Sequence, residues 1–530
     1  MFERLFRFFA DGWTSGIRTR DPNIKSVVLY QLSYGPKTQK FGVVNQIIRH
    51  VSIDLLTESP YTPSTFAGER RREVSFIEKI ISNPKEFTLN VETLGECTIE
   101  SPIRNRDFID DDERILITEN VKHLQKASEH FGVTPSFERA GPHQKIFHDP
   151  SWSRVGIVTA GGLCPGLNHV IKGLVEILMF DYGIKNIYGI RYGYAGLSPR
   201  YGYKPIMLDT DTVDTIHEHG GTMLGSSRGQ QDTGEIVDTL ARMNINLLFC
   251  VGGDGSLRCA RDIAEECKRR KLAVSVVGIP KTIDNDLHFV GRSFGFETAV
   301  AEATQIIQAA HTEAKGTFNG IGLVKLMGRD SGFITAYATL ANPVVNFCLI
   351  PELDFEMEGP HGLLAALSYR FERFKDHAVI VVAEGAGQRH IAGEPVRKDA
   401  SGNILKKDIG EYLRQRITEH FKRANLEASV KYFDPSYTIR SVPAKGTDAI
   451  RCYMLARNAV HAAMAGRTNC VVGNQDDWYT LVPIKLATIE RQKVNLNSDL
   501  WRAVLDATGQ TLYFGGGANG NGRNAGTTVP

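Results

Sequence analysis

Short apolar runs rich in β-branched residues recur from Arg154 onward, and each is followed by a glycine-containing segment and then by apolar residues at helical spacing. The clearest units read RVGIVTA-GGLCPG-NHVIKGLVEILMF, INLLFCV-GGDGS-LRCARDIAEECKRR and IGLVKLM-GRDSG-FITAYATLA. Strands that are apolar throughout and alternate with helices predict an α/β protein with mostly parallel sheets covered on both faces. Ligands of such sheets bind beyond the carboxyl ends of the strands, where each glycine segment is expected.

The two ends of the chain lack this pattern. Residues 1–95 show weak periodicity, apart from one amphipathic helix expected within GERRREVSFIEKIISNP, so we assign them to an N-terminal extension. Residues 513–530 are rich in Gly and Asn. We predict that this tail is disordered, because such a composition buries too little apolar surface to offset its ordering entropy.

The composition is that of a globular protein with little charge bias. The 530 residues exceed one ordinary domain, and a formal net charge of +2 gives no reason to expect nucleic acid or a membrane as a partner. No run reaches the roughly 20 apolar residues of a membrane-spanning helix, and the N-terminus lacks a secretory signal. The cysteines have neither C-x-x-C nor zinc spacing, which favours reduced thiols in a cytoplasmic protein. They are Cys97, Cys164, Cys250, Cys259, Cys267, Cys348, Cys452 and Cys470.

The loop GGDGS has the composition of a phosphate-binding turn. Adjacent glycines after a strand let the backbone approach a phosphate closely, and the helix that follows offers its N-terminal amides. Asp254 within the loop would repel a phosphate unless a cation lay between them, which points to Mg²⁺. The alternative is an ordinary turn between a strand and a helix, because Gly-Asp-Gly alone is a weak signal.

The segment PKTIDND places Lys281 and Thr282 directly before two carboxylates, Asp284 and Asp286. An alcohol that accepts a phosphoryl group needs a base near its proton, and a lysine can screen phosphate charge. The alternative is an Asx turn in which the aspartates only cap the backbone. Both acids, a lysine and a proline within seven residues after a strand favour the catalytic interpretation.

Two further loops carry weaker signals. GGLCPG lacks the spacing G-x-G-x-x-G, which disfavours a dehydrogenase, yet it can seat a nucleotide at the helix expected near Asn168. MGRDSG places Arg329 at a strand end, where a guanidinium suits bidentate binding of phosphate. The alternative for Arg329 is a surface ion pair.

Taken together, GGxxPG, GGDGS, PKTIDND and MGR, in this order and spacing, resemble the phosphofructokinase family over roughly residues 135–510. RAGPHQKIF, PSYTIR and WRAVLDATGQ are similar to the long plant and trypanosomatid ATP-dependent branch. The resemblance implies Mg²⁺-assisted phosphoryl transfer from ATP to the 1-hydroxyl of fructose 6-phosphate, in glycolysis. The resemblance also implies a homo-oligomer, either a tetramer or a dimer.

The resemblance assigns roles by position. It makes Asp284 the general base, with Lys281 and Arg329 as further catalytic residues, and Asp254 the magnesium-associated carboxylate. Nucleotide contacts are implied for Gly162, Arg228, Gly229, Gly253, Asp254, Gly255 and Ser256. Fructose 6-phosphate contacts are implied for Thr282, Ile283, Asp284, Met327, Gly328, Arg329, Glu384, Tyr437 and Arg440, with Lys431 as a weaker match.

The phosphoryl donor depends on position 255. Pyrophosphate-dependent relatives typically have a second aspartate there, which would crowd the α-phosphate of a nucleotide, so Gly255 favours ATP. Lys281 is shared with the pyrophosphate-dependent enzymes, so a pyrophosphate-dependent phosphofructokinase stays an alternative. A non-catalytic regulatory subunit of the same fold is a second alternative, which the retained Asp254, Asp284 and Arg329 disfavour. NAD and diacylglycerol kinases also use Gly-Gly-Asp-Gly but lack PKTIDND.

Two departures bear on regulation and assembly. Lys172 and Glu176 replace two arginines of the bacterial effector site, which argues against allosteric control by the bacterial effectors. Gly320 stands where short-chain relatives carry an arginine that reaches across a subunit interface.

The expected fold is two Rossmann-like lobes plus the N-terminal extension. We expect an embracing segment at 96–154, a nucleotide lobe at 155–294 completed by about 438–490, and a fructose 6-phosphate lobe at 295–437.

Overall fold

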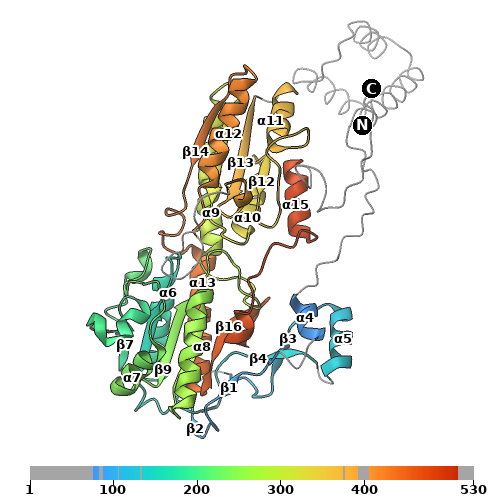
Figure 1. Ribbon diagram of the computed structural model, residues 1–530. Helices are drawn as coiled ribbons and strands as arrows, with labels where there is room; N and C mark the ends of the chain where they lie inside the picture. Colours follow the sequence, from blue (N-terminus) through green and yellow to red (C-terminus); the bar gives the residue numbers. More distant parts are fainter. Residues whose placement is uncertain are drawn as a thin grey trace, which may run out of the picture. The chain divides into compact units, whose positions relative to one another are not determined.

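A computed structural model describes residues 76–82, 87–104, 107–131, 134–373, 376–391 and 405–510 (Figure 1). Most of the predicted extension at 1–95 and the predicted disordered tail at 513–530 lie outside these described residues. The helix expected within GERRREVSFIEKIISNP is α4 (Phe76–Ser82), which buries Phe76, Ile80 and Ile81.

The larger sheet has nine strands in the described residues, in the order β3-β4-β17-β16-β10-β9-β6-β7-β8. Its five central strands, from β16 to β7, are parallel, and the strands outside them pair antiparallel. The bounds along the sheet are β3 (Arg114–Leu116), β4 (Ser136–Arg139), β17 (Trp478–Pro483), β16 (Cys470–Gln475), β10 (Ser275–Pro280), β9 (Leu247–Gly252), β6 (Val155–Thr159), β7 (Ile187–Ile190) and β8 (Ile206–Met207).

The second sheet has four strands, all parallel, in the order β12-β13-β11-β14. They are β12 (Phe347–Leu349), β13 (His377–Ala383), β11 (Gly320–Leu326) and β14 (Ser429–Phe433). Two short antiparallel pairs complete the described strands. One joins β1 (Glu92–Thr93) to β15 (Arg467–Thr468), and the other joins β2 (Ile99–Glu100) to β5 (Lys145–Ile146).

Helices lie on both faces of each sheet, as Figure 1 shows. The remaining α-helices are α5 (Val121–Phe131), α6 (Leu167–Phe180), α7 (Thr233–Met243), α8 (Asp254–Arg269), α9 (Phe296–Lys315), α10 (Phe333–Ala341), α11 (Leu363–Glu372), α12 (Ile409–Arg423), α13 (Gly446–Met464), α14 (Ile484–Ala487) and α15 (Asp499–Thr508). Short 3₁₀ turns are η1 (Gly193–Leu197), η2 (Pro199–Tyr201), η3 (Ile216–Glu218) and η4 (Gln388–Ile391).

Strand β9 shows why its sequence is apolar throughout. Successive side chains of a strand point to opposite faces, so Leu247 and Phe249 pack in the cluster that contains α6 and α13. Leu248 and Cys250 pack in the other cluster, with α7 and α8. Both faces of β9 are therefore covered by other side chains. This explains why apolar and polar residues do not alternate along the strand, as they do in sheets with one solvated face.

The sequence expectation of an α/β fold with mostly parallel sheets is confirmed. One local detail differs from the expected order of strand, loop and helix. Gly252 is the last residue of β9 and α8 begins at Asp254, so Asp254, Gly255 and Ser256 belong to the first turn of the helix and only Gly253 links the strand to it. All eight cysteines are free thiols. Among the described residues, no helix has the length and apolar character needed to span a bilayer.

Candidate active site

Three sequence motifs meet at one edge of the larger sheet because their strands are parallel neighbours. In the register, Thr159 at the end of β6 pairs with Val251 of β9, and Gly252 pairs with Pro280 of β10. GGLCPG, GGDGS and PKTIDND follow these three strands directly. The carboxyl edge of a parallel sheet is the general location of ligand sites in such folds.

The N-terminus of α8 faces this edge. Gly253 is the N-cap, with no side-chain hydrogen bond to the first turn, so the helix begins with backbone amides and the partial positive charge of its dipole. A Cβ added at Gly255 would meet nothing within 4 Å. The Asp254 side chain is 9% exposed and pairs with Arg258 on the same helix, through Arg258 Nε to Oδ1 at 3.0 Å and Arg258 Nη2 to Oδ2.

Lys281 links the loops after β10 and β6. Its Nζ donates a hydrogen bond to the carbonyl oxygen of Gly162 at 2.6 Å, and its backbone N–H donates to the carbonyl oxygen of Gly252. Burial lowers the pKa of Lys281 to about 8, and the charges of Arg228 and Arg440 act in the same direction. The ammonium is thus held in a site that already carries excess positive charge.

Arg228 and Arg440 flank the same loop, although 212 positions separate them (440 − 228). A Cβ added at Gly162 would lie 3.4 Å from Arg228 Nη2 and 3.5 Å from Arg440 Nη1. The pKa of Arg440 is lowered, first by burial and then by the charge of Arg228. Three cations gathered in a partly desolvated site favour a multiply charged anion such as a phosphate chain. Gly229 directly follows Arg228, with a φ of 104°.

Asp284 has an unsatisfied carboxylate oxygen. Its Oδ1 is buried and has no hydrogen-bond partner among the described residues. The pKa of Asp284 is raised to about 8, first by burial and then by the charges of Asp286 and Glu384, while Arg491 and Arg329 act in the opposite direction. A buried carboxylate with a raised pKa and an open acceptor position has the properties of a general base.

The neighbours of Asp284 are fixed by hydrogen bonds. Thr282 Oγ1 donates to Asp286 Oδ1 at 2.5 Å, and Ser293 Oγ donates to the carbonyl oxygen of Thr282. Ile283 is buried at 7% exposure. The loop therefore has little freedom to move the Asp284 side chain away from its position.

The loop after β11 brings the second sheet to the same site. Ser331 Oγ lies 3.4 Å from the carbonyl oxygen of Asp284, to which it donates a hydrogen bond. Arg329 Nε lies 3.9 Å from Glu384 Oε1, at the end of the neighbouring strand β13. Gly328 has a φ of 130°, and a Cβ there would lie 2.5 Å from the carbonyl oxygen of Ser331. Met327, the first residue of this loop, packs partly buried against the core.

Tyr437 and Arg440 form a stacked pair, with the Arg440 guanidinium carbon 4.6 Å from the centre of the Tyr437 ring. Tyr437 is 75% exposed. The sequence grouped Arg440 with Arg329 and Glu384, whereas the geometry also brings it beside Arg228 at Gly162. Arg440 therefore lies between the two groups of predicted ligand residues.

Two arginines at this site were not singled out from the sequence. Arg258 pairs with Asp254, which the spacing of four residues on a helix could have revealed. Arg491 Nη1 lies 2.7 Å from Asp330 Oδ2, and its Nε lies 3.7 Å from both Asp254 Oδ2 and Asp286 Oδ2. No local signal marks Arg491, because its partners are more than 160 positions away (491 − 330 = 161).

A metal at this site would depend on ligands from a substrate. The described residues contain no group of three or more His, Cys, Asp or Glu side chains that could hold a metal ion. Asp254 is a single carboxylate at the helix terminus where phosphates are expected. One carboxylate combined with substrate phosphates and water is the way in which Mg²⁺ is commonly held.

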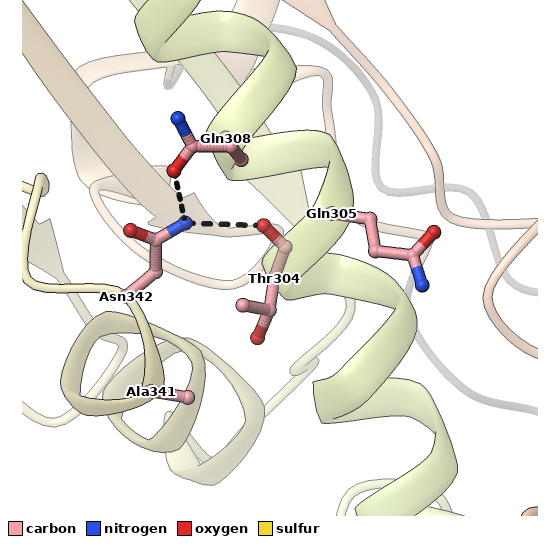
Figure 2. A pocket seen from close by; sticks show the side chains of 5 residues that line it. All are labelled: Thr304, Gln305, Gln308, Ala341 and Asn342. Atoms are coloured by element: carbon pink, nitrogen blue, oxygen red, sulfur yellow. Dashed lines mark hydrogen bonds between the residues drawn. The ribbon is translucent and has the colours of Figure 1, made fainter.

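An open pocket of about 450 Å³ lies elsewhere, between α9 and α10. It is lined by Thr304, Gln305, Gln308, Ala341 and Asn342. Figure 2 shows that Asn342 donates hydrogen bonds to the Thr304 carbonyl oxygen and to Gln308. None of the predicted site residues lines this pocket, and it offers no charged side chain for a phosphate.

The three residues expected to bear on regulation and assembly have simple surroundings. Lys172 Nζ lies 3.2 Å from Glu176 Oε1, so these two side chains form an ion pair on α6. Gly320 begins β11, and a Cβ there would lie 2.0 Å from the carbonyl oxygen of Ala314. A side chain at position 320 would therefore not fit without a shift of the backbone.

Comparisons with known proteins bear on the fold and on the family. Two solved structures share the fold. A pyrophosphate-dependent phosphofructokinase from Marinobacter aquaeolei has a TM-score of 0.54 at 20% identity, covering 70% of this chain and 95% of its own. The phosphofructokinase from Saccharomyces cerevisiae has a TM-score of 0.52 at 19% identity, covering 67% and 47%. These two likenesses concern the fold alone.

Sequence relatives are considerably closer. The ATP-dependent 6-phosphofructokinase of Borreliella burgdorferi is 48% identical over 440 residues, which is 81% of this chain and 98% of the relative. That of Trypanosoma cruzi is 48% identical over 375 residues, covering 70% and 76%. ATP-dependent 6-phosphofructokinase 7 of Arabidopsis thaliana is 47% identical over 383 residues, covering 72% and 78%. The family model described as phosphofructokinase matches residues 154–463, more than half of the chain. This chain therefore belongs to the phosphofructokinase family.

Proposed function

We propose that this protein transfers the γ-phosphoryl group of ATP to the 1-hydroxyl of fructose 6-phosphate, giving fructose 1,6-bisphosphate and ADP in glycolysis. The observation that carries the proposal is the buried Oδ1 of Asp284, which has no hydrogen-bond partner among the described residues. Asp284 lies in the loop whose Lys281 joins a cluster of three cations and donates its backbone N–H to Gly252, just before α8. The relatives at 45–48% identity named ATP-dependent 6-phosphofructokinase support the same reaction.

Asp284 acts as the general base. Its free Oδ1 accepts the proton of the sugar hydroxyl while the hydroxyl oxygen attacks the γ-phosphorus and the bond to the β-phosphate oxygen breaks. Arg329 and Arg491 lower the pKa of Asp284 against the effect of burial, which keeps proton transfer within the physiological range. A positioned base of this kind contributes about 10²–10⁴-fold to a rate.

The nucleotide end of the site is formed by backbone and cations. The amides at the start of α8, over Gly253 to Ser256, point to the phosphates, and Lys281 and Arg228 offset their charge. Gly162 and Gly229 line the approach from the neighbouring loops. The open space at Gly255 leaves room for the α-phosphate of a nucleotide. Pyrophosphate stays the alternative donor, because Lys281 is shared with the pyrophosphate-dependent enzymes.

Asp254 would hold Mg²⁺ together with the donor phosphates. The ion supplies charge neutralisation of the transferred group and of the leaving group when it is bound. Arg258, which pairs with the Asp254 carboxylate in this structure, would share that carboxylate or move aside.

The sugar-phosphate end is formed largely by the second sheet. Met327, Gly328 and Arg329 follow β11, and Glu384 follows β13, so all four lie at the carboxyl edge of that sheet. Thr282, Ile283, Asp284, Tyr437 and Arg440 complete the proposed fructose 6-phosphate contacts. The division into a nucleotide lobe at 155–294 with 438–490 and a sugar-phosphate lobe at 295–437 forms part of the same proposal.

We also propose that the protein forms a homo-oligomer in the cytoplasm. Free thiols fit a reducing compartment, although two of the Arabidopsis thaliana relatives are named chloroplastic. Light scattering and fractionation test these two points separately. A regulatory subunit without catalysis is disfavoured because Asp254, Asp284 and Arg329 are all retained at the site.

The decisive experiment is a spectrophotometric assay of the purified protein with fructose 6-phosphate, Mg²⁺ and either ATP or pyrophosphate. We expect turnover with ATP and little with pyrophosphate. Turnover with pyrophosphate alone would assign the other donor, and turnover with neither would support the regulatory subunit. Omission of Mg²⁺ should abolish the reaction.

A further inference from the structure

The last described part of the chain, residues 484–510, runs from one sheet to the other, and we call it the C-terminal strap. It leaves the larger sheet after β17 and ends with α15, which packs on α10 and β12 of the second sheet (Figure 1). Gln510 fixes this end, because its Oε1 accepts from the Cys348 backbone N–H at 2.6 Å and its Nε2 donates to the Cys348 carbonyl at 3.1 Å.

Arg491 lies in the first half of the strap and contacts acids in loops of both sheets. Its tight partner is Asp330, at 2.7 Å, in the loop after β11. Asp254 at the start of α8 and Asp286 in the loop after β10 each lie 3.7 Å from Arg491 Nε. The side chains of Asp254 and Asp286 are both 9% exposed, and that of Arg491 is 26% exposed.

The strap backbone joins the same two loops. The N–H of Gln492 donates to the carbonyl oxygen of Asp286 at 2.8 Å. Farther along, the N–H of Val494 donates to Glu352 Oε1 at 2.7 Å, and the same oxygen accepts from the N–H of Gly332 at 2.9 Å. The loop that contains Asp284 and the loop that contains Arg329 are therefore both anchored to residues 491–494.

We propose that Arg491 is a positioning residue for phosphoryl transfer. By bridging Asp286 and Asp330, it fixes the position of the loop after β10 relative to the loop after β11. The proposal rests on the proposed function, because the two loops carry the base and the sugar-phosphate arginine of that reaction.

The physical reason is the concentration of negative charge. Asp254, Asp286 and Asp330 all lie in ion-pair range of the Arg491 guanidinium. Asp254 and Asp286 are buried, whereas Asp330 is 39% exposed and also pairs with Lys406. Buried carboxylates repel each other unless a cation lies between them. Arg491 supplies that cation from a third segment, and its planar guanidinium presents several donors in a fixed geometry. A lysine at the same position would restore the charge but not this geometry. Small displacements of reacting groups reduce rates strongly, by about 10²-fold for a shift of 1 Å.

The test compares Arg491→Met, Arg491→Lys and Asp330→Asn with the wild type, with Arg502→Met as a control. Arg502 lies on the same strap and is 68% exposed, and its ion-pair partner within the described residues is the exposed Asp499. The measurements are kcat, KM for both substrates, the melting temperature, and the dissociation constant for fructose 6-phosphate from calorimetry without nucleotide or Mg²⁺.

We expect Arg491→Met to lower kcat by about 10- to 100-fold and Asp330→Asn to have a similar effect. Arg491→Lys should recover part of the loss, and Arg502→Met should match the wild type. Calorimetry should show weaker binding of fructose 6-phosphate in Arg491→Met and Asp330→Asn, because the loop that carries Arg329 is no longer held. The double variant Arg491→Met with Asp330→Asn should lose less than the product of the two single losses, because the contact between these two residues can be lost only once. Part of each single loss stays separate, since Asp330 also pairs with Lys406 and Arg491 also lies near Asp254 and Asp286.

Two results would overturn the proposal. One is a folded Arg491→Met protein with kcat and sugar-phosphate affinity within about two-fold of the wild type. The other is a double variant whose loss equals the product of the two single losses, because the residues would then act independently. If Arg491→Met fails to fold, Asp330→Asn decides by itself, and wild-type kcat and affinity in that variant would overturn the proposal. If the proposed function itself is wrong, the wild type will be inactive, and this result differs from either outcome that would overturn the role of Arg491.

Discussion

Lys281 Nζ and the carbonyl oxygen of Gly162 are joined by a hydrogen bond of 2.6 Å, which ties the loop after β10 to the loop after β6. A lysine ammonium has three N–H donors, so one hydrogen bond to a backbone carbonyl leaves the others able to bind a ligand. The same contact orients the ammonium toward the loop that Arg228 and Arg440 flank.

Replacing Lys281 with Met should lower kcat/KM for ATP by about 10²-fold, because a fixed positive charge at the transferred phosphate is lost. KM for fructose 6-phosphate should change less. Exposed Lys185 provides the matched control, and Lys185→Met should behave as the wild type. Steady-state kinetics with each substrate varied will check this. An unchanged kcat/KM for ATP would remove Lys281 from the catalytic residues.

Replacing Asp284 with Asn should lower kcat by about 10²–10⁴-fold, the usual loss when a general base is removed. Asn has nearly the same shape, so both KM values should stay close to those of the wild type. Asp211→Asn, at an exposed position, is the control for the same chemical exchange. The assignment would be wrong if Asp284→Asn turned over at a rate near that of the wild type.

The same Asp284→Asn change should stabilise the ligand-free protein at alkaline pH. The pKa of Asp284 in the folded protein is raised to about 8, whereas a carboxyl in an unfolded chain titrates near pH ~4. The folded state therefore binds the proton more tightly, so the wild type loses stability as pH rises from about 4 through about 8. Asn carries no charge and escapes this loss.

Melting temperatures measured at pH 6 and pH 9 will check this prediction, and the gain of Asp284→Asn over the wild type should be larger at pH 9. Asp211→Asn should show no such difference. Equal gains at both pH values would mean that burial does not raise the pKa of Asp284.

Replacing Gly255 with Asp should sharply reduce the use of ATP without unfolding the protein. A Cβ at this position meets open space, and an acidic residue in the first turn of α8 is favourable for the helix. The carboxylate would instead occupy the path of the α-phosphate and repel it. Gly255→Ala is the control for size without charge, and it should keep most of the ATP activity.

The measurement for position 255 is kcat/KM with ATP and with pyrophosphate for the wild type and both variants. Lys281 stays in place to offset the charge of the shorter donor, so some activity with pyrophosphate can appear in Gly255→Asp. Full ATP activity in Gly255→Asp, or robust activity of the wild type with pyrophosphate, would contradict the donor assignment.

Replacing Arg329 or Arg440 with Ala should raise KM for fructose 6-phosphate, because each loses a charge-assisted contact to phosphate. Arg440 gives the sharper test, since it lies beside Arg228 at Gly162. An increase in KM for ATP alone, in either variant, would move that arginine to the nucleotide end of the site. Arg373→Ala is a suitable control, because Arg373 is exposed and directly follows α11.

The sequence by itself determined the repeating units and the chemistry at their ends. Strand β9 is apolar at every position because both faces of its sheet are covered, and that property is visible in the local pattern of residues. Because GGDGS and PKTIDND each follow such a strand, their placement at the carboxyl edge followed from the order of elements alone. The candidate base Asp284 and the candidate metal residue Asp254 were therefore accessible from the sequence.

Only the tertiary structure decided which distant residues meet at that edge. Arg440 lies near Arg228 at Gly162 because the chain leaves the second sheet after β14 and returns to the larger one. Arg491 contacts Asp330 because the chain crosses to the second sheet again after β17. No local pattern encodes such contacts, since they depend on the order of strands within the sheets. The unsatisfied oxygen and raised pKa of Asp284 have the same origin, because burial and neighbouring charges exist only once both sheets are in place.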